Sequence, residues 1–472
     1  MDNVEKVDVQ DVLYLFKQRI DNVYSQLPPK LEVTSWDSDI TVTNGTVTLQ
    51  PAGVDGNVYS YTLTDYGIWT ASGTYRSVTV NVDSCKIYKV NINAYRYGYR
   101  INKHESDPYE SVEYLYDAVG MTPAKMNFSA GVFEYGDWAD VWFVKDNKPC
   151  MLKSDGSVDY FLDPDDYSLT EDGEPSDVAN TFYDGNAMAQ IPLCWVYRYE
   201  DDNYYYEIVS NAQFDENYKA YAHTDKDGNI KDYFYRALFG ASGGSNKLRS
   251  ISGQSLAQSL TTYQCVDAAT ANGEGWYIDT WSQRELIRTL LILVGKSLDA
   301  PSVFGHGNCR GSGVSPLAAG TLSDKGQFYG YNSNTQQVKV FHVEGFWGDQ
   351  WLMTAGVIDY YGTVYVKMTP EGDGYQIDNV DGYTSTNVAP PIGSKFISKV
   401  ACSEFGIIPL QASGSSSTYF CDILWTSNSG LFYIFIGGAS DNTYEMVGLF
   451  TWQSSTSPSS SNSNTNCAIS YI

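Results

Sequence analysis

The first 29 residues carry apolar side chains at the spacing of a coiled-coil helix. Successive apolar positions are 4, 3, 4, 3 and 4 residues apart, the a/d repeat of nearly three heptads, at Val9, Leu13, Phe16, Ile20, Val23 and Leu27. Pro28 and Pro29 then end the helix. Residues 1–29 are predicted to form an attachment or oligomerisation helix, and an amphipathic helix packed on its own domain is the alternative.

Residues 30–93 alternate between apolar and polar positions in short runs. Asn-Gly and other glycine-containing turns separate the runs ITVTNGTVTLQ, NVYSYTLTDYGIWTASGTYRSVTVNV and CKIYKVNINAY. This pattern predicts several short strands in a small β-sandwich of immunoglobulin-like size. We expect this domain to act as a spacer.

The pattern of residues 94–270 predicts further strands joined by Asp-Gly turns. We expect this segment to be a β-rich lead-in to the C-terminal part of the chain, 271–472. The pattern changes at GEGWYIDTWSQRELIRTLLILVGKSL, which predicts a helix with Thr280 or Ser282 as its N-cap. One face of this helix is apolar, at Leu286, Leu290, Leu293 and Val294.

The last six residues have the period of a strand. Cys467, Ile469 and Tyr471 alternate with Ala468, Ser470 and Ile472. Before them, residues 453–466 are almost entirely Ser, Thr and Asn, which cannot bury enough apolar area to become ordered by themselves. A terminal strand docked in a sheet would hold this loop at both ends and make it a surface for recognition. A solvated tail without function is the alternative.

These elements predict a mainly β chain with some α structure, and the composition refines the picture. With 472 residues and 43% hydrophobic content, the chain can form a large core. Its 56 acidic and 30 basic residues give a formal charge of −26, which repels phosphate backbones and anionic membranes. We expect neither nucleic-acid binding nor membrane insertion. The 39 tyrosines suit strand packing and contact surfaces that stack on sugars or proteins.

The eight cysteines are widely scattered, without a C-x-x-C pair or a histidine at metal-ligand spacing, and are expected to be free, mostly buried thiols. The N-terminal residues lack the basic and apolar regions of a signal peptide, and no window approaches about 18 apolar residues. We expect synthesis in a reducing cytosol.

No motif indicates catalysis. The four histidines lie in no recognised Ser, Cys or metal motif, and they are His104, His223, His306 and His342. Gly305-His306-Gly307 lacks the Lys-Ser/Thr pair of a phosphate loop and predicts a surface turn. Residues 225–229 begin like a calcium loop but lack the distal Glu, so we expect a hairpin turn. We therefore expect no catalytic residue, no metal and no cofactor.

Three blocks, in order, resemble the C-type-lectin-like domain of phage tail-tip receptor-binding proteins: TWSQRELIRTLL, VEGFWGDQWLMTAGVID, and LFYIFIGGAS followed by VGLFTWQ. That group includes the variable proteins of diversity-generating retroelements and shares its fold with formylglycine-generating enzymes. Gly348-Asp349-Gln350-Trp351 stands in the place of its G-N-x-W-E-W-like block, and Gly437-Gly438-Ala439-Ser440 in the place of its G-G-S-W-like block. Trp347 and Trp351 are expected to pack on one face of a small sheet, and the two glycines to form a tight turn.

The resemblance implies that residues between the Gly-Gly turn and the last strand are displayed for ligand binding. The positions carried over are Asp441, Asn442, Thr443, Tyr444, Glu445, Trp452, Gln453, Ser455, Ser457, Asn462 and Asn464. Adenine-directed diversification in that group yields Asn, Ser, Thr, Asp and Tyr, and most of these residues are of those types.

The chain departs from the family in two places. The enzymes of this fold need a closely placed cysteine pair for copper-dependent oxidation, whereas Cys467 has no evident partner beyond Cys402 or Cys421. The usual Gly-Phe-Arg ending is replaced by CAISYI.

The resemblance implies a phage or prophage tail-tip receptor-binding protein that is not an enzyme. It would assemble in the host cytoplasm as a homotrimer and reside in the virion. Its partners would be other tail proteins and a bacterial cell-surface receptor, either protein or glycan. The alternatives are a formylglycine-generating-type oxidase, a tail-associated glycan hydrolase and a structural tail protein.

Overall fold

The computed structural model describes residues 95–472, apart from 373, 376 and 377, and the backbone of five short strands before them. β1 (Val33–Trp36) pairs with β5 (Tyr88–Val90), and β2 (Thr46–Leu49), β3 (Tyr59–Thr64) and β4 (Ile68–Ser72) form an antiparallel meander. Strands are thus present where the sequence predicts them between 30 and 93. The helix predicted over 1–29 lies outside the described residues.

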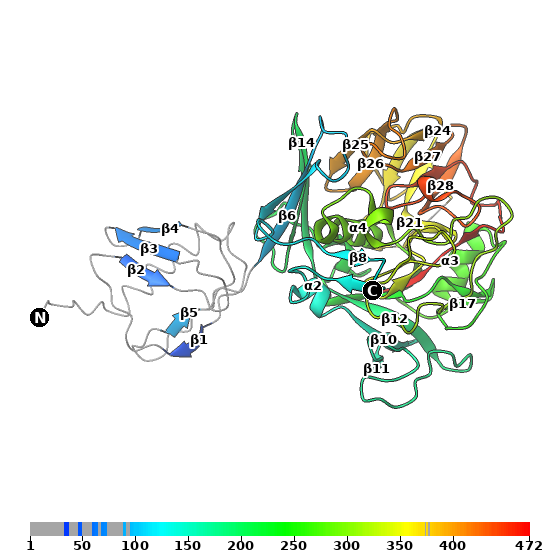
Figure 1. The fold of residues 1–472 in the computed structure, drawn as a ribbon, viewed down its shortest axis with the longest axis horizontal. Helices are drawn as coiled ribbons and strands as arrows, with labels where there is room; N and C mark the ends of the chain where they lie inside the picture. The colour runs from blue at the N-terminus through cyan, green and yellow to red at the C-terminus, as the bar shows by residue number, and fades with distance from the viewer. Residues whose placement is uncertain are drawn as a thin grey trace, which may run out of the picture.

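From residue 95 onward the chain is mainly β, as predicted, and its larger sheets surround one long helix (Figure 1). The first sheet has the strand order β13 (Trp195–Glu200), β14 (Tyr204–Ser210), β6 (Arg96–Asn102), β7 (Val112–Tyr116). Alternate residues of this sheet, among them Tyr99, Ile101 and Val209, are buried in the main hydrophobic cluster.

The second sheet contains the C-terminal strand. Its order is β11 (Val158–Phe161), β10 (Lys148–Lys153), β12 (Gly185–Pro192), β15 (Tyr233–Ala237), β31 (Ile469–Tyr471), β18 (Trp276–Ile278). β31 is antiparallel to both of its neighbours, and Cys467, Ile469 and Ser470 are fully buried. The prediction that the chain end docks into a sheet is therefore confirmed.

The third sheet carries the flanks of the polar loop. Its order is β23 (Thr384–Ser385), β22 (Thr363–Val366), β21 (Trp351–Tyr360), β28 (Leu431–Ile436), β29 (Trp452–Ser454), β27 (Ile423–Thr426), β24 (Gly393–Phe396). A short strand, β30 (Thr465–Asn466), also pairs in parallel with β21. Strands thus hold the chain immediately before and after residues 455–464.

Short hairpins and helices fill the remaining space. The hairpins are β8 (Lys125–Asn127) with β9 (Val132–Glu134), β16 (Ser242–Gly244) with β17 (Lys247–Arg249), β19 (Lys339–Val340) with β20 (Val343–Glu344), and β25 (Lys399–Ser403) with β26 (Gly406–Gln411). The shorter helices are α2 (Trp142–Lys145), α3 (Thr262–Thr270) and α5 (Ala300–Phe304), with 3-10 turns η1 (Tyr221–His223) and η2 (Tyr444–Met446). Among the described residues, no helix is both long enough and apolar enough to cross a membrane.

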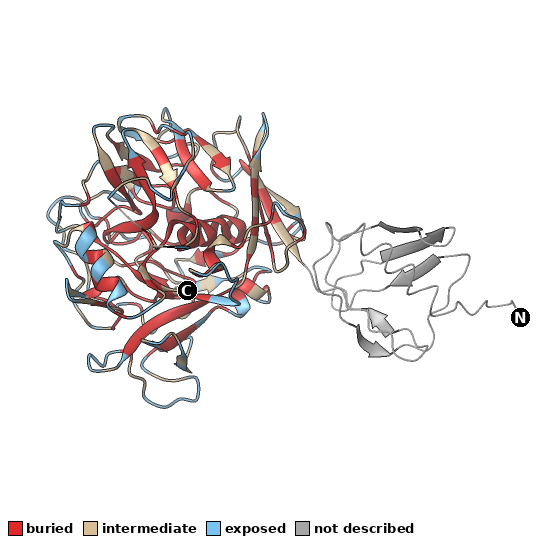
Figure 2. Cartoon of the chain, turned by 180° about the vertical axis from the view of Figure 1, so that it is seen from behind, coloured by how far each residue is buried: buried red, intermediate tan, exposed pale blue. Residues whose placement is uncertain are grey.

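The predicted helix is α4 (Trp281–Gly295), and all of its residues are buried (Figure 2). The side chain of Thr280 caps it by accepting a hydrogen bond from Gln283 N, so Thr280 and not Ser282 is the N-cap. The sequence pattern predicts one apolar face, but sheets and hairpins cover the polar face as well. α4 is therefore a core helix and carries charged residues into the interior.

The charged residues of α4 are held in ion pairs with two sheets. The Arg288 guanidinium contacts Glu207 of β14 at 2.6 Å and Glu285, one turn away, at 2.9 Å. Glu207 also pairs with Arg198 of β13 at 2.7 Å. Burial alone would raise the pKa of Glu207, but Arg288 and Arg198 outweigh that effect and hold the pKa below its usual value.

A second ionic cluster surrounds the beginning of α4. Asp279 lies just before the helix and forms a two-pronged ion pair with Arg236 of β15, at 2.8 and 3.1 Å. Arg284 approaches Asp279 at 3.5 Å and donates to the Phe346 carbonyl oxygen at 2.8 Å. The orientation of α4 is thus fixed by charges as well as by apolar packing.

Trp347 and Trp351 do not share a face, contrary to the expectation. Trp347 belongs to the main cluster with Phe304 and Phe346, whereas Trp351 packs edge-to-face on Trp425 in a second cluster. Gly348 lies between them with a φ of 90°, so the chain turns before β21 begins.

Arg288→Met is expected to lower the free energy of unfolding by about 3–5 kcal/mol, because Glu207 and Glu285 would lose the cation that compensates their burial. The matched control is Lys125→Met, which removes an exposed pair with Glu134 at 3.9 Å and is expected to change stability by less than about 1 kcal/mol. Denaturant unfolding followed by tryptophan fluorescence measures both. Equal midpoints for the two variants would contradict a structural role for the Arg288 network.

Candidate functional site

The Gly-Gly turn after β28 leads into residues 441–445, which lie at the surface. Gly437 and Gly438 have φ values of 92° and 76°, and a Cβ on Gly438 would come within 2.6 Å of Val447. Asp441, Thr443, Tyr444 and Glu445 follow as exposed residues. The tight turn expected from the two glycines is confirmed.

The Gly-rich loop at 305–313 supports this turn. Arg310 N donates to the Ser440 carbonyl at 3.1 Å, and Gly311 N donates to the Asn442 carbonyl at 2.9 Å. The rings of His306 and Tyr444 stack with centroids 4.7 Å apart and planes 9° from parallel. His306, partly exposed, and Arg310, exposed, therefore lie beside the predicted binding residues.

The buried Asp349 holds both the Gly-rich loop and the Gly-Gly turn through hydrogen bonds. Its carboxylate accepts hydrogen bonds from Asn308 Nδ2 at 2.6 Å, Leu317 N at 3.0 Å and Gln337 Nε2 at 3.1 Å, and its carbonyl accepts one from Ser440 N at 3.0 Å. Burial raises the pKa of Asp349 to about 6 despite these donors. The Gly-Asp-Gln-Trp block therefore positions the exposed residues without reaching solvent itself.

The Ser- and Asn-rich loop is held along its length. Thr262 N donates to the Pro458 carbonyl, and Ser259 N donates to the Asn462 carbonyl, each at 3.0 Å. Asn464 Nδ2 donates to Asp441 Oδ2 at 3.0 Å and links the loop to the Gly-Gly turn. We call the solvent-reaching parts of His306, Arg310, 441–445 and 455–464 the display surface.

Ten of the eleven predicted binding residues reach solvent at least in part, and Trp452 does not. Trp452 is only 2% exposed and packs edge-to-face on Trp281 of α4, with ring centroids 5.7 Å apart. Its prediction as a ligand contact is wrong, because β29 runs between β28 and β27 in the middle of the third sheet. Gln453 is partly exposed, and its Nε2 donates to Ser455 and Thr456.

His306 and Arg310 are the functional candidates that sequence reasoning missed. The glycine run around them predicts a surface turn at 305–307, but Gly305 and Gly307 are buried in an irregular segment and only His306 is partly exposed. The contacts with residues 440–444 join parts of the chain that are far apart in sequence, so no local pattern reveals them.

The other candidates for chemistry have structural roles. His223 is fully buried, which lowers its pKa to about 3, and His342 is hydrogen-bonded to the Tyr167 hydroxyl at 2.8 Å. Residues 225–229 form a tight turn in which Asp225 Oδ1 accepts hydrogen bonds from Asp227 N and Asn229 N, as expected for a hairpin. The described side chains include no group of three or more His, Cys, Asp or Glu suited to hold a metal ion.

The thiol neighbour of Cys467 is Cys265 of α3, and not Cys402 or Cys421. The hydrogen bond with Cys265, together with burial, raises the pKa of Cys467 well above its usual value. All seven cysteines in the described part of the chain are free and buried, as predicted. Neutral, buried thiols of this kind are poor nucleophiles and poor metal ligands.

Neither a family model nor a curated protein matches the chain.

Asp359→Asn is expected to alter the pH dependence of stability. Burial raises the pKa of Asp359 to about 6, while Ser454 Oγ and Gly362 N donate to its two oxygens at 2.9 and 2.8 Å. In the unfolded chain the pKa is about 3.9. The protonated carboxyl therefore stabilises the fold below about pH 4, and this contribution is lost as the pH rises through about 6.

Asn keeps an acceptor for Gly362 N and a donor toward Ser454 Oγ but cannot ionise. The difference in the free energy of unfolding between the variant and the unsubstituted chain should shift in favour of the variant by about 1–3 kcal/mol from pH 5 to pH 8. Denaturant unfolding at the two values measures the gain, with Asp172→Asn, at an exposed loop position, as the control for loss of one charge. A stability difference that is independent of pH, or that has the opposite sign, would refute the assignment.

Proposed function

We propose that the chain is a receptor-binding protein of a phage or prophage tail tip, and that the display surface binds a receptor on the bacterial cell. The observation that carries this proposal is the combination of polar, exposed side chains with a backbone fixed by strands on both sides. Short Ser, Thr and Asn side chains offer adaptable hydrogen bonds, and the stacked Tyr444 offers rigid contact area. A surface ordered before binding loses less entropy when a receptor binds.

The proposal extends to the architecture. Residues 271–472 would be a C-type-lectin-like receptor-binding domain with 94–270 as its β-rich lead-in, residues 30–93 an immunoglobulin-like spacer, and residues 1–29 the trimerising attachment helix. The resemblance of the three sequence blocks to tail-tip proteins supports this division. Several copies on one virion would strengthen a modest affinity per site through multivalency.

A second candidate function is that of a formylglycine-type oxidase. The observation that favours it is the proximity of Cys265 and Cys467. Both thiols lie in the second hydrophobic cluster and are at most 1% exposed. A peptide substrate could reach them only if α3 moved away from the sheet. We therefore favour binding over catalysis.

Asp441→Ala combined with Tyr444→Ala is expected to weaken binding of the fluorescently labelled full chain to bacterial cells by about 10–100-fold, because central aromatic contacts dominate interface energy. Both side chains are exposed, so the fold should persist, which thermal unfolding checks.

Phe182→Ala is the matched control, since Phe182 is 96% exposed and lies on the loop before β12, away from the predicted binding residues in sequence. Flow cytometry over a panel of bacteria measures retention. If the double variant and the control bind the same cells equally well, the display surface is not the receptor-binding surface.

A further inference from the structure

The second sheet bears a row of aromatic rings on one face. The strand register places Tyr235 of β15 opposite Tyr471 of β31, and Tyr471 opposite Trp276 of β18, so the three side chains share a face. The ring centroid of Tyr471 lies 6.2 Å from that of Tyr235 and 5.4 Å from that of Trp276. Tyr233 lies two residues before Tyr235, on the same face, and is 37% exposed.

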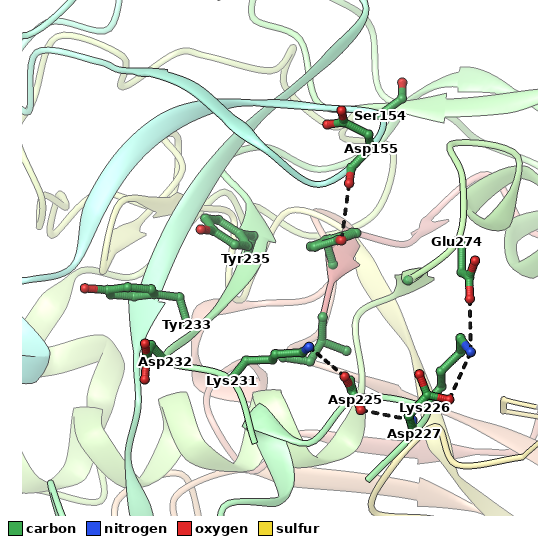
Figure 3. A pocket seen from close by; sticks show the side chains of 13 residues that line it. Ser154, Asp155, Asp225, Lys226, Asp227, Lys231, Asp232, Tyr233, Tyr235 and Glu274 are labelled. Carbon is green, nitrogen blue, oxygen red and sulfur yellow. Dashed lines mark hydrogen bonds and ion pairs between the residues drawn. The ribbon is translucent and has the colours of Figure 1, made fainter. Parts of the chain in front are cut away.

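Three tyrosines of this face, Tyr233, Tyr235 and Tyr471, line an open pocket of about 620 Å³ (Figure 3), whereas Trp276 is fully buried in the second hydrophobic cluster. Tyr233, Tyr235 and Asp232 line one side, and the charged residues of the 225–227 turn and Glu274 line the opposite side, with Asp155 at the top of the view. Pockets of this size hold small ligands.

The charged wall of the pocket is fixed by ion pairs. Lys231 contacts Asp225 at 2.8 Å, and Lys226 bridges Asp227 and Glu274 at 3.1 and 3.0 Å. Because both lysines are already paired with carboxylates, the pocket offers little free positive charge. Five carboxylates, of Asp155, Asp225, Asp227, Asp232 and Glu274, line it against these two lysines.

The side facing this wall has unused hydrogen-bonding groups. Within the part of the chain that the structure describes, the Asp232 carboxylate and the Tyr233 hydroxyl take part in no hydrogen bond or ion pair. Both residues are exposed at the pocket mouth. A ligand that enters therefore finds a free acceptor beside a free aromatic face.

Tyr471 lines the pocket and packs closely against the turn between β10 and β11. Gly156, in the turn between β10 and β11, has a φ of 83°, and a Cβ there would overlap the Tyr471 ring. The Tyr471 hydroxyl donates to the Asp155 carbonyl at 3.5 Å. The backbone of this turn thus fits closely against the ring, and an aromatic group fixed before binding loses little entropy when a ligand stacks on it.

We infer that this pocket is a binding site for a neutral pyranose unit of a glycan. The less polar C–H face of a pyranose packs on tyrosine rings, while one of its hydroxyls donates to the free carboxylate of Asp232 in a charge-assisted hydrogen bond. The excess of carboxylates repels uronic acids, sialic acids and phosphorylated sugars. The site lies on the second sheet, shares no residue with the display surface, and does not depend on the proposed receptor-binding function.

Saturation-transfer NMR and calorimetry with the full chain test this assignment. The probes are the methyl glycosides of glucose, galactose, mannose and rhamnose, N-acetylglucosamine, and glucuronic acid as the anionic comparison. At least one neutral probe should bind, and glucuronic acid should bind at least about fivefold more weakly than the best of them.

Tyr233→Ala should raise the Kd of the best probe by at least about tenfold, whereas Tyr361→Ala, which removes a 63% exposed tyrosine beyond the end of β21, should leave it unchanged. Asp232→Asn should reduce the ratio between the affinity for the best neutral probe and the affinity for glucuronic acid. Misfolding would not produce this change. Tyr444→Ala should have no effect, which separates this site from the display surface. Absence of binding by every neutral probe, equal affinity for glucuronic acid, or an unchanged Kd in Tyr233→Ala would overturn the inference.

Discussion

The ion pairs of α4 are the constraint on which the rest of the structure depends. A helix whose residues are all buried cannot carry two arginines and a glutamate unless carboxylates, guanidinium groups and backbone donors meet them from the surrounding elements. Glu207 comes from the first sheet, Arg236 and Asp279 from the second sheet and its connection to α4, and Ile407 N of β26 donates to Glu285 at 2.8 Å. The charges thus link α4 to both sheets and to β26, and removing one partner would leave another charge buried without compensation.

The display surface depends on this framework through a short series of contacts. Gly348 N donates to the Gly437 carbonyl at 3.1 Å, and the carboxylate of the neighbouring Asp349 accepts a hydrogen bond from Asn308 of the Gly-rich loop at 2.6 Å. On the other side, β29 packs on α4 through Trp452 and Trp281. The residues that the family resemblance assigns to ligand binding therefore divide into two groups. Trp452 supports the display surface from the core, and the others reach solvent.

Much of the framework follows from the sequence because it has local causes. The period-2 alternation of residues 467–472 predicts β31, Thr280 marks the beginning of α4, and two adjacent glycines mark the turn after β28. The burial of Trp452, the Cys265–Cys467 neighbours and the stacking of His306 on Tyr444 were not predictable in this way. Each depends on residues brought together from distant parts of the chain, and the same is true of the aromatic row that includes Tyr471.

The most direct test of the proposed receptor-binding role of the display surface is hydroxyl-radical footprinting of the full chain, free and bound to any bacterial cells that retain it. Tyr444 is 39% exposed and Phe182 is 96% exposed, so both rings are oxidised in the free protein. If the display surface binds the receptor, binding protects Tyr444 and leaves Phe182 as reactive as before. Protection of Phe182 with an unchanged Tyr444 would contradict this role.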